Sequence, residues 1–116
     1  NNIAVGEYHK DSDFGHNTHE LNFWLPFTDA WDTNAVWIGD PNSEGHECME
    51  VKYGEVANFD GANTLHGNKD NLTGKSRLSI DFRIFPLKYY NESEQADAKT
   101  ITQKKKLIIG EYWTKL

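Results

Sequence analysis

Short runs of strand-forming residues, separated by turn residues about every ten positions, constrain this chain more than any other feature of its sequence. The clearest run is 76–85, SRLSIDFRIF, in which apolar and polar residues alternate. Because successive side chains of a strand point to opposite faces, this run predicts a strand with one apolar and one polar face. The apolar face carries Leu78, Ile80, Phe82 and Ile84. The polar face carries Arg77, Ser79, Asp81 and Arg83.

Four shorter segments also favour strands, namely 20–27, 34–39, 47–53 and 55–61. Turn residues recur between the runs, including Asp40-Pro41-Asn42, Gly67-Asn68 and Thr73-Gly74. The segment 106–113 is a candidate terminal strand, whereas 92–106 suits either a short surface helix or a flexible connection. Many short strands with frequent turns are typical of sandwiches, jelly rolls and barrels, so we predict an all-β fold in a single domain spanning 1–116.

Charge and cysteine content argue against several classes of function. The 116 residues carry a net charge of −6 and no basic stripe, which disfavours nucleic acid or an anionic membrane as a partner. Cys48 is the sole cysteine, so the chain has no intramolecular disulfide and no cysteine zinc cluster. The same observation favours a reducing, cytoplasmic location. No apolar run approaches the roughly 18 residues of a membrane span.

His9, Asp11 and His66 are the candidate metal ligands and catalytic residues of this sequence. On an extended strand, residues two apart project to the same side, so the imidazole of His9 and the carboxylate of Asp11 converge. His66 follows a strand-like run and precedes a glycine turn, which makes it the candidate third ligand from a distant part of the chain. Two histidines and one carboxylate form the facial triad of non-haem Fe(II) oxygenases, which leaves coordination positions open.

Arg77 and Ser79 follow His66 along the chain and project to the same side of the predicted strand. An arginine guanidinium binds a carboxylate through two parallel charge-assisted hydrogen bonds. This pair therefore predicts a site for a carboxylate. Asn22, which shares a face with Trp24 on the predicted strand 20–27, is a candidate to donate a hydrogen bond to a cosubstrate.

His16, His19 and Glu20 form a second polar cluster, which invites comparison with the metal site of cupins. A cupin site needs two histidines spaced two apart with a glutamate a few residues later. Here the histidines are three apart and Glu20 is adjacent to the second. Residues three apart on a strand point to opposite faces, so we expect His16 and His19 to line a substrate mouth rather than to bind metal.

The order His-x-Asp, distal His and Arg-x-Ser gives the chain a resemblance to a known family. In HKDSDFGH…ELNFWLPFTDAWDTNAVWI and LHGNKDNLTGKSRLSIDFR, it resembles the Fe(II)/2-oxoglutarate-dependent oxygenases of the double-stranded β-helix, or jelly-roll, fold. Within them it is similar to the phytanoyl-CoA-dioxygenase-like group, and most to its branch of streptomycin-biosynthesis hydroxylase-like proteins. The resemblance covers residues 5–87.

This resemblance implies a cupin-like jelly roll that hydroxylates a small-molecule substrate. It implies that His9, Asp11 and His66 hold Fe(II), and that Arg77 with Ser79 binds the distal carboxylate of 2-oxoglutarate. Two alternatives stay open, a non-catalytic jelly-roll module that binds a sugar or small acid, and a cupin-type isomerase that uses no cosubstrate. The Arg77 and Ser79 pair favours the oxygenase, because neither alternative has a particular need for a carboxylate clamp.

The chain is short for this family, whose members carry N-terminal helices behind the larger sheet and a strand before the His-x-Asp pair. Only about eight residues precede His9 here, so we predict a short or N-terminally truncated jelly roll. The apolar face of 76–85 then needs another cover, either the C-terminal segment 107–113 or a second subunit. We therefore expect a homodimer or a trimmed fragment.

Overall fold

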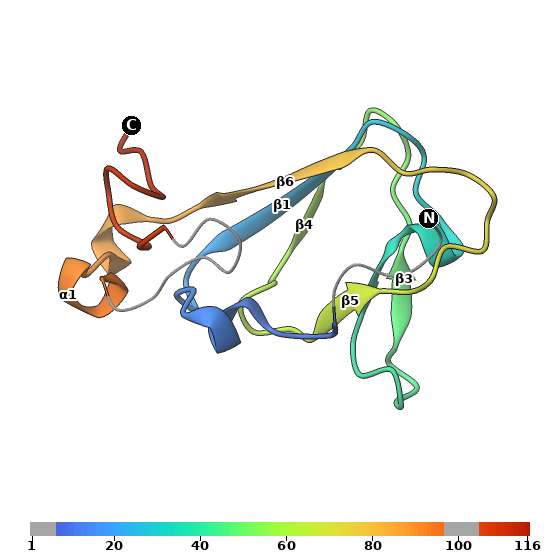
Figure 1. The fold of residues 1–116 in the computed structure, drawn as a ribbon, viewed down its shortest axis with the longest axis horizontal. Helices are drawn as coiled ribbons and strands as arrows, with labels where there is room; N and C mark the ends of the chain where they lie inside the picture. The colour runs from blue at the N-terminus through green and yellow to red at the C-terminus, as the bar shows by residue number, and fades with distance from the viewer. Residues whose placement is uncertain (1–6, 97–104) are drawn as a thin grey trace.

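The structure is a computed structural model that describes residues 7–96 and 105–116. Its strands form two antiparallel sheets of three strands each (Figure 1). The first sheet has the order β4-β1-β6, with β1 at Leu21–Pro26, β4 at Ala57–Phe59 and β6 at Ser79–Ile84. The second has the order β3-β2-β5, with β2 at Val36–Ile38, β3 at Glu47–Met49 and β5 at His66–Asn68. The all-β prediction is confirmed, and the jelly-roll arrangement stays a prediction.

Helical structure in the described residues is limited to single turns. Three are 3-10 turns, η1 at Asp11–Phe14, η2 at Asp32–Asn34 and η3 at Leu87–Tyr89. The helix α1, at Glu92–Gln95, begins where the Asn91 side chain accepts hydrogen bonds from the backbone N–H groups of Ser93 and Glu94. The rest of the segment 92–106 mostly lies outside the described residues. None of the helices in the described ranges is long and apolar enough to cross a membrane.

The pairing of β1 with β6 places the polar face of β6 on the same side as the buried residues of β1. Asn22 lies opposite Arg83 and Trp24 opposite Asp81. On the other side of β1, Asn22 also lies opposite Phe59 of β4. Asn22 and Trp24 are buried and Leu21 is exposed, so the alternation predicted for these two strands is confirmed. One face of this sheet therefore carries both the packing residue Trp24 and a row of polar groups.

The hydrophobic core is small and joins the two sheets. Trp24 from β1 packs in one cluster with Val36 from β2, together with three residues from the connecting loops. These three are Ala30, Ala35 and Val51. Dispersion and the burial of apolar surface at this cluster hold the two sheets together. The remaining inner surface of the first sheet is free to carry polar side chains.

The sequence Gly67-Asn68 forms part of β5, although it was predicted to be a turn. Gly67 lies opposite Trp37 of β2, and a Cβ atom added at Gly67 would lie 2.9 Å from the ring of Tyr8. The glycine thus permits close approach of another segment rather than a reversal of the chain. His66 is the first residue of β5.

The C-terminal segment 106–113 is a turn, so the strand predicted there is wrong. Ile109 and Trp113 form an isolated bridge, and Gly110 adopts φ +96°, a left-handed conformation that favours glycine. Leu107 in this segment is fully buried, at 0% exposure.

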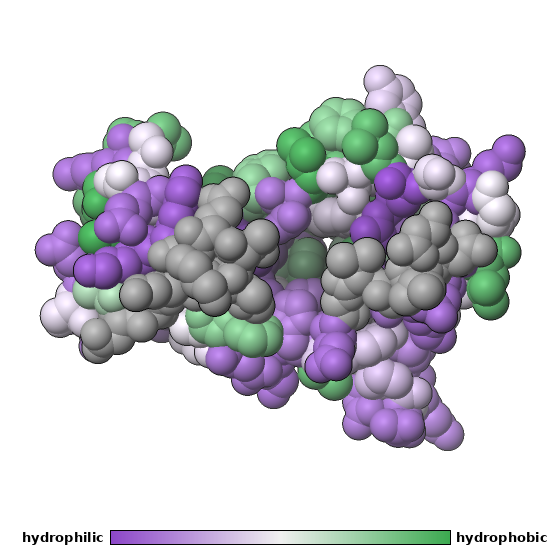
Figure 2. Space-filling view, viewed as in Figure 1, coloured by the Kyte–Doolittle hydropathy of each residue, from purple (hydrophilic) through white to green (hydrophobic). Residues whose placement is uncertain are grey.

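An apolar face of the first sheet is exposed to solvent in this structure. Phe82 is 43% exposed and stacks on Phe23 of β1, while Leu78 is 63% exposed. Ile80, Ile84, Leu21 and Phe27 are similarly exposed. One alternative predicted that the segment 107–113 covers the apolar face of 76–85. The exposure of these side chains shows that it does not. Figure 2 shows hydrophobic residues along the edge of the molecule above β1 and β6.

We propose that a second copy of the chain covers this face. The exposed apolar side chains share one face of the sheet, and each partner of a standard interface buries roughly 800 Å². The wild-type chain is expected to show twice its monomer mass in light scattering, and Phe82→Asp to show the monomer mass, because a carboxylate would be desolvated in the interface. Leu72→Asp is the control, since Leu72 is 78% exposed and lies outside this face. A monomeric wild-type chain would contradict the proposal.

Candidate metal centre

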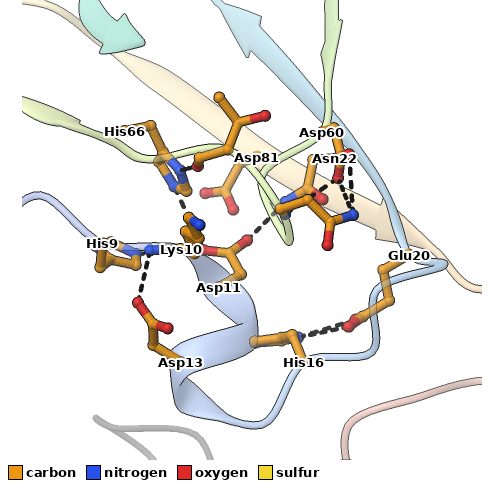
Figure 3. Close-up of polar contacts among 12 residues, drawn as sticks. His9, Lys10, Asp11, Asp13, His16, Glu20, Asn22, Asp60, His66 and Asp81 are labelled. Atoms are coloured by element: carbon orange, nitrogen blue, oxygen red, sulfur yellow. Dashed lines mark hydrogen bonds and ion pairs between the residues drawn. The ribbon is translucent and has the colours of Figure 1, made fainter. Parts of the chain in front are cut away.

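Two distant segments bring His9 and His66 together through their backbones. The N–H of His9 donates to the carbonyl oxygen of His66 at 2.9 Å, and the N–H of His66 donates back at 3.0 Å. Asp11 opens the 3-10 turn η1 directly after His9 and is not on an extended strand, as was predicted. Its carboxylate nevertheless lies close to both imidazoles (Figure 3).

The three predicted ligands meet at a single point. Oδ1 of Asp11 lies 3.2 Å from Nε2 of His9 and 3.4 Å from Nε2 of His66. All three donor atoms lie within 4.8 Å of one another. Ligand atoms about 2.1 Å from one ion and at right angles to each other are about 3 Å apart, so these separations suit a single metal ion. The His9, Asp11 and His66 group can therefore hold a metal.

Backbone carbonyls fix the orientation of both imidazoles. Nδ1 of His9 lies 2.8 Å from the carbonyl oxygen of Glu7, and Nδ1 of His66 lies 2.8 Å from that of Thr64. Because a carbonyl oxygen only accepts hydrogen bonds, each Nδ1 carries a proton and donates. Nε2 of a neutral ring then has a free lone pair, which is the state that a metal ligand needs.

The second carboxylate oxygen of Asp11 is held by two donors. Oδ2 accepts hydrogen bonds from Nδ2 of Asn22 and from Nη2 of Arg83, both at 2.8 Å. Asp11 is only 4% exposed, so these contacts replace the water that its charge has lost. Arg83 was predicted to lie on the polar face of its strand, with no role in the site. Its role depends on the strand register that places it opposite Asn22, and this register could not be predicted from the sequence.

The same contacts shift the pKa values of Asp11 and His66. Burial alone would raise the pKa of Asp11, but hydrogen bonds from His66 and Arg83 and the charge of Arg83 outweigh burial and hold that pKa well below its usual range. Burial alone would lower the pKa of His66, but its hydrogen bonds to Asp11 and Thr64 outweigh this and raise it above the ordinary 6.5. Both shifts favour the charged pair in the metal-free protein.

A cavity of about 350 Å³ opens beside these ligands and is lined by all six of the predicted site residues. Arg77 lies just before β6, with its guanidinium 5.2 Å from the ring centre of Trp24. Its Nη1 donates to the carbonyl oxygen of Asn34 at 2.7 Å and to Oδ1 of Asn68 at 3.2 Å. Oδ1 of Asn22 is buried and accepts no hydrogen bond from the described residues. The cavity thus contains an anchored cation and an unsatisfied acceptor.

The second polar cluster lies apart from this centre. His16 and Glu20 pair with each other, with 2.9 Å between Nδ1 and Oε1, and Glu20 is 3% exposed. His19 stacks on Tyr89 with 3.8 Å between ring centres. Among the described residues, the metal-competent group contains none of these three side chains.

Gly61 is a further residue of the site, and sequence analysis treated it only as the end of a strand. Its carbonyl oxygen accepts a hydrogen bond from the N–H of Asp11 at 2.9 Å. A Cβ atom at this position would lie 2.8 Å from Nδ2 of Asn22 and 3.1 Å from Oδ2 of Asp11. The absence of a side chain leaves room for the Asn22 and Asp11 hydrogen bond.

No family model matches this chain. The chain is 44% identical over 113 residues to the streptomycin biosynthesis protein StrG of Streptomyces griseus. The alignment covers 97% of this chain and 52% of that protein. The chain therefore spans about half the length of the curated relative that it matches.

We expect Gly61→Ala to weaken metal binding although it removes no ligand. The added methyl group displaces the Asn22 amide and the Asp11 carboxylate, and changes at groups that support metal ligands typically cost about 10–100-fold in affinity. Isothermal titration with Zn²⁺ or Mn²⁺ would measure the loss. Gly45→Ala is the matched control, because the nearest atom to its Cβ would be 3.9 Å away. Equal affinity of both variants and the wild type would contradict this role of Gly61.

Metal affinity should depend on pH through His66. Because its pKa is raised, the protonated imidazole stabilises the metal-free fold fully below the ordinary pKa of 6.5, and this contribution is lost as pH rises through the raised pKa. A metal ion needs the neutral ring, so affinity should fall by up to about tenfold per pH unit below the same pKa. Metal titrations from about pH 5 to pH 9 would measure this. A constant affinity over that range would be inconsistent with ligation by His66.

Proposed function

We propose that this chain forms the catalytic core of an Fe(II)- and 2-oxoglutarate-dependent oxygenase that hydroxylates a small metabolite. The observation that carries the proposal is the combination of His9, Asp11 and His66 with Arg77 in one cavity. A metal-binding group and a cation at some distance from it suit a cosubstrate that chelates metal at one end and has a carboxylate at the other.

The donor set favours a metal with open coordination positions. Two imidazole nitrogens and one carboxylate oxygen would occupy one face of an octahedral ion and leave the opposite face for exogenous ligands. Their arrangement is typical of non-haem Fe(II) sites, whereas structural zinc sites are closed by four protein ligands. We therefore assign His9, Asp11 and His66 as the Fe(II) ligands.

Arg77 is the residue that would bind the distal carboxylate of 2-oxoglutarate. Both of its hydrogen bonds to described residues use Nη1, so Nε and Nη2 are left to form a pair of bonds with a carboxylate. Burial lowers the pKa of Arg77, but the group stays charged at any physiological pH. Ser79 lines the same cavity and would add a hydroxyl donor. Asn22, the expected donor to the cosubstrate, uses its Nδ2 to donate to Asp11, and 2-oxoglutarate has no donor for its unpaired Oδ1.

When bound, the iron and 2-oxoglutarate would supply the oxidation of a C–H bond by O2. The residues of this chain orient the cosubstrate and limit access of water. Trp24, Val36 and Phe59 form the apolar part of the cavity wall and are buried or half-buried. A low-polarity wall strengthens the attraction between Arg77 and a carboxylate, because the local dielectric constant is lower than that of water.

The relative supports a role in small-molecule metabolism. Its printed name assigns it to the biosynthesis of streptomycin, and the two chains are 44% identical. Since this chain spans about half of that protein, hydroxylation and the class of substrate are our proposal. Cys48 is free, which suits a reducing compartment, and we propose a cytoplasmic location.

Anaerobic titration with Fe(II) and then 2-oxoglutarate tests this function. The wild-type protein should develop the weak visible charge-transfer band of the metal chelate. His66→Ala should abolish the band because a ligand is lost, and Arg77→Ala should raise the 2-oxoglutarate concentration needed for it by at least about tenfold, the loss of a charge-assisted pair. The loss of the band in His66→Ala and the weaker cosubstrate binding in Arg77→Ala follow from the roles of metal ligand and carboxylate-binding residue.

Two controls match these variants. His19→Ala removes a histidine that stacks on Tyr89 outside the cluster, and Lys75→Ala removes an exposed cation two residues before Arg77. Both should leave the band unchanged. Folded wild-type protein that binds Fe(II) but gives no band with 2-oxoglutarate would exclude this function, and a cupin-type isomerase or a non-catalytic binding module would then explain the site.

A further inference from the structure

We propose that Arg83 is a positioning residue that makes Asp11 a ligand through one oxygen only, and that Tyr112 in the C-terminal turn holds Arg83 in place. This inference rests on the metal centre of the proposed function. It concerns how the chain controls the number of coordination positions left open, which the ligand set alone does not determine.

The two carboxylate oxygens of Asp11 have different partners. Oδ1 faces both imidazoles, whereas Oδ2 faces away from them and accepts hydrogen bonds from Arg83 and Asn22, at 2.8 Å each. A carboxylate binds a metal through either one or two oxygens, and hydrogen bonds to one oxygen remove its lone pairs from competition. The two donors thus keep Oδ2 from binding the ion, which leaves Oδ1 as the only carboxylate oxygen that can bind it.

The second step is the anchoring of Arg83. Its position in β6 is fixed by pairing with Asn22 of β1, so the two donors approach Oδ2 from neighbouring strands. Nη1 of Arg83 donates to the hydroxyl oxygen of Tyr112 at 3.0 Å. Nη1 also lies 3.4 Å from Oδ2 of Asp81, a side chain that is 60% exposed and so contributes little. Tyr112 is the half-buried partner that holds the guanidinium.

The third step is the anchoring of Tyr112. Its backbone N–H donates to the carbonyl oxygen of Ile108 within the C-terminal turn, and its ring packs edge-on against Trp113 with 4.9 Å between centres. The same ring contacts His16 at 5.6 Å. Leu107 of the same turn is fully buried. A chain of two hydrogen bonds therefore connects the C-terminal turn to the metal ligand Asp11.

The consequence concerns the open face of the centre. With Asp11 bound through one oxygen, three positions of an octahedron stay open, enough for a chelating cosubstrate and one further ligand. If Oδ2 also bound the metal, only two positions would remain. Arg83 would thus preserve the third position without touching the substrate or the metal.

Mn(II) alone is the probe for this inference, because its bound waters can be counted by the relaxation of water protons. Wild-type protein loaded with Mn(II) should carry three such waters. Arg83→Met should carry two, which lowers the inner-sphere relaxation by about a third. Tyr112→Phe should change it in the same direction by less. Arg83→Lys should restore part of the wild-type value, because the ammonium can still donate to Oδ2.

Asp81→Asn is the control and should match the wild type, because Asp81 contacts Arg83 and is not bonded to Asp11. A purely electrostatic role of Arg83 predicts a different result. In that case Arg83→Met would bind Mn(II) more tightly, since a neighbouring cation is removed, and would keep all three waters. That outcome, or wild-type relaxation in both Arg83→Met and Tyr112→Phe, would overturn the proposal.

The test is independent of the proposed cosubstrate. A protein whose Mn(II) waters respond to these variants as expected, but which does not bind 2-oxoglutarate, would support the role of Arg83 and reject the oxygenase. Folded wild-type protein that binds no Mn(II) would overturn both.

Discussion

The buried charge of Asp11 is the interaction on which the rest of the structure depends. A carboxylate that is 4% exposed is stable only where other groups replace the water that it has lost. Here the replacements come from His9 beside it, from Asn22 of β1, from His66 of β5 and from Arg83 of β6. Both sheets contribute, so their relative position and the charge at the centre are determined together.

This requirement explains why the hydrophobic core is confined to one region. The inner face of the first sheet has to supply Asn22 and Arg83, which leaves Trp24 as its main packing residue toward Val36. The apolar residues of β6, among them Phe82, consequently point to the other face, where they are exposed. The polar centre inside and the apolar surface outside are two results of one alternating sequence.

The sequence predicted which residues meet at the centre better than it predicted what supports them. His9, Asp11 and His66 do come together as a group that could hold a metal, although the extended strand expected at Asp11 is a 3-10 turn. Alternation correctly assigned both faces of β1 and β6. Arg83 and Gly61 were missed because their roles depend on which atom lies opposite, and neither register nor close approach can be read from one chain. For the same reason Gly67 was taken for a turn residue, although Tyr8 occupies the space beside it.

The backbone bridge between His9 and His66 has a consequence for the stability of the folded chain. The two residues enclose the segment 9–66, which contains β1, β2, β3 and β4. An ion bound by both imidazoles would join the ends of this segment as a covalent crosslink does, and would reduce the entropy that the chain gains on unfolding. The metal would then act as a reversible crosslink, and the resistance of the folded chain to proteolysis would depend on the supply of the ion.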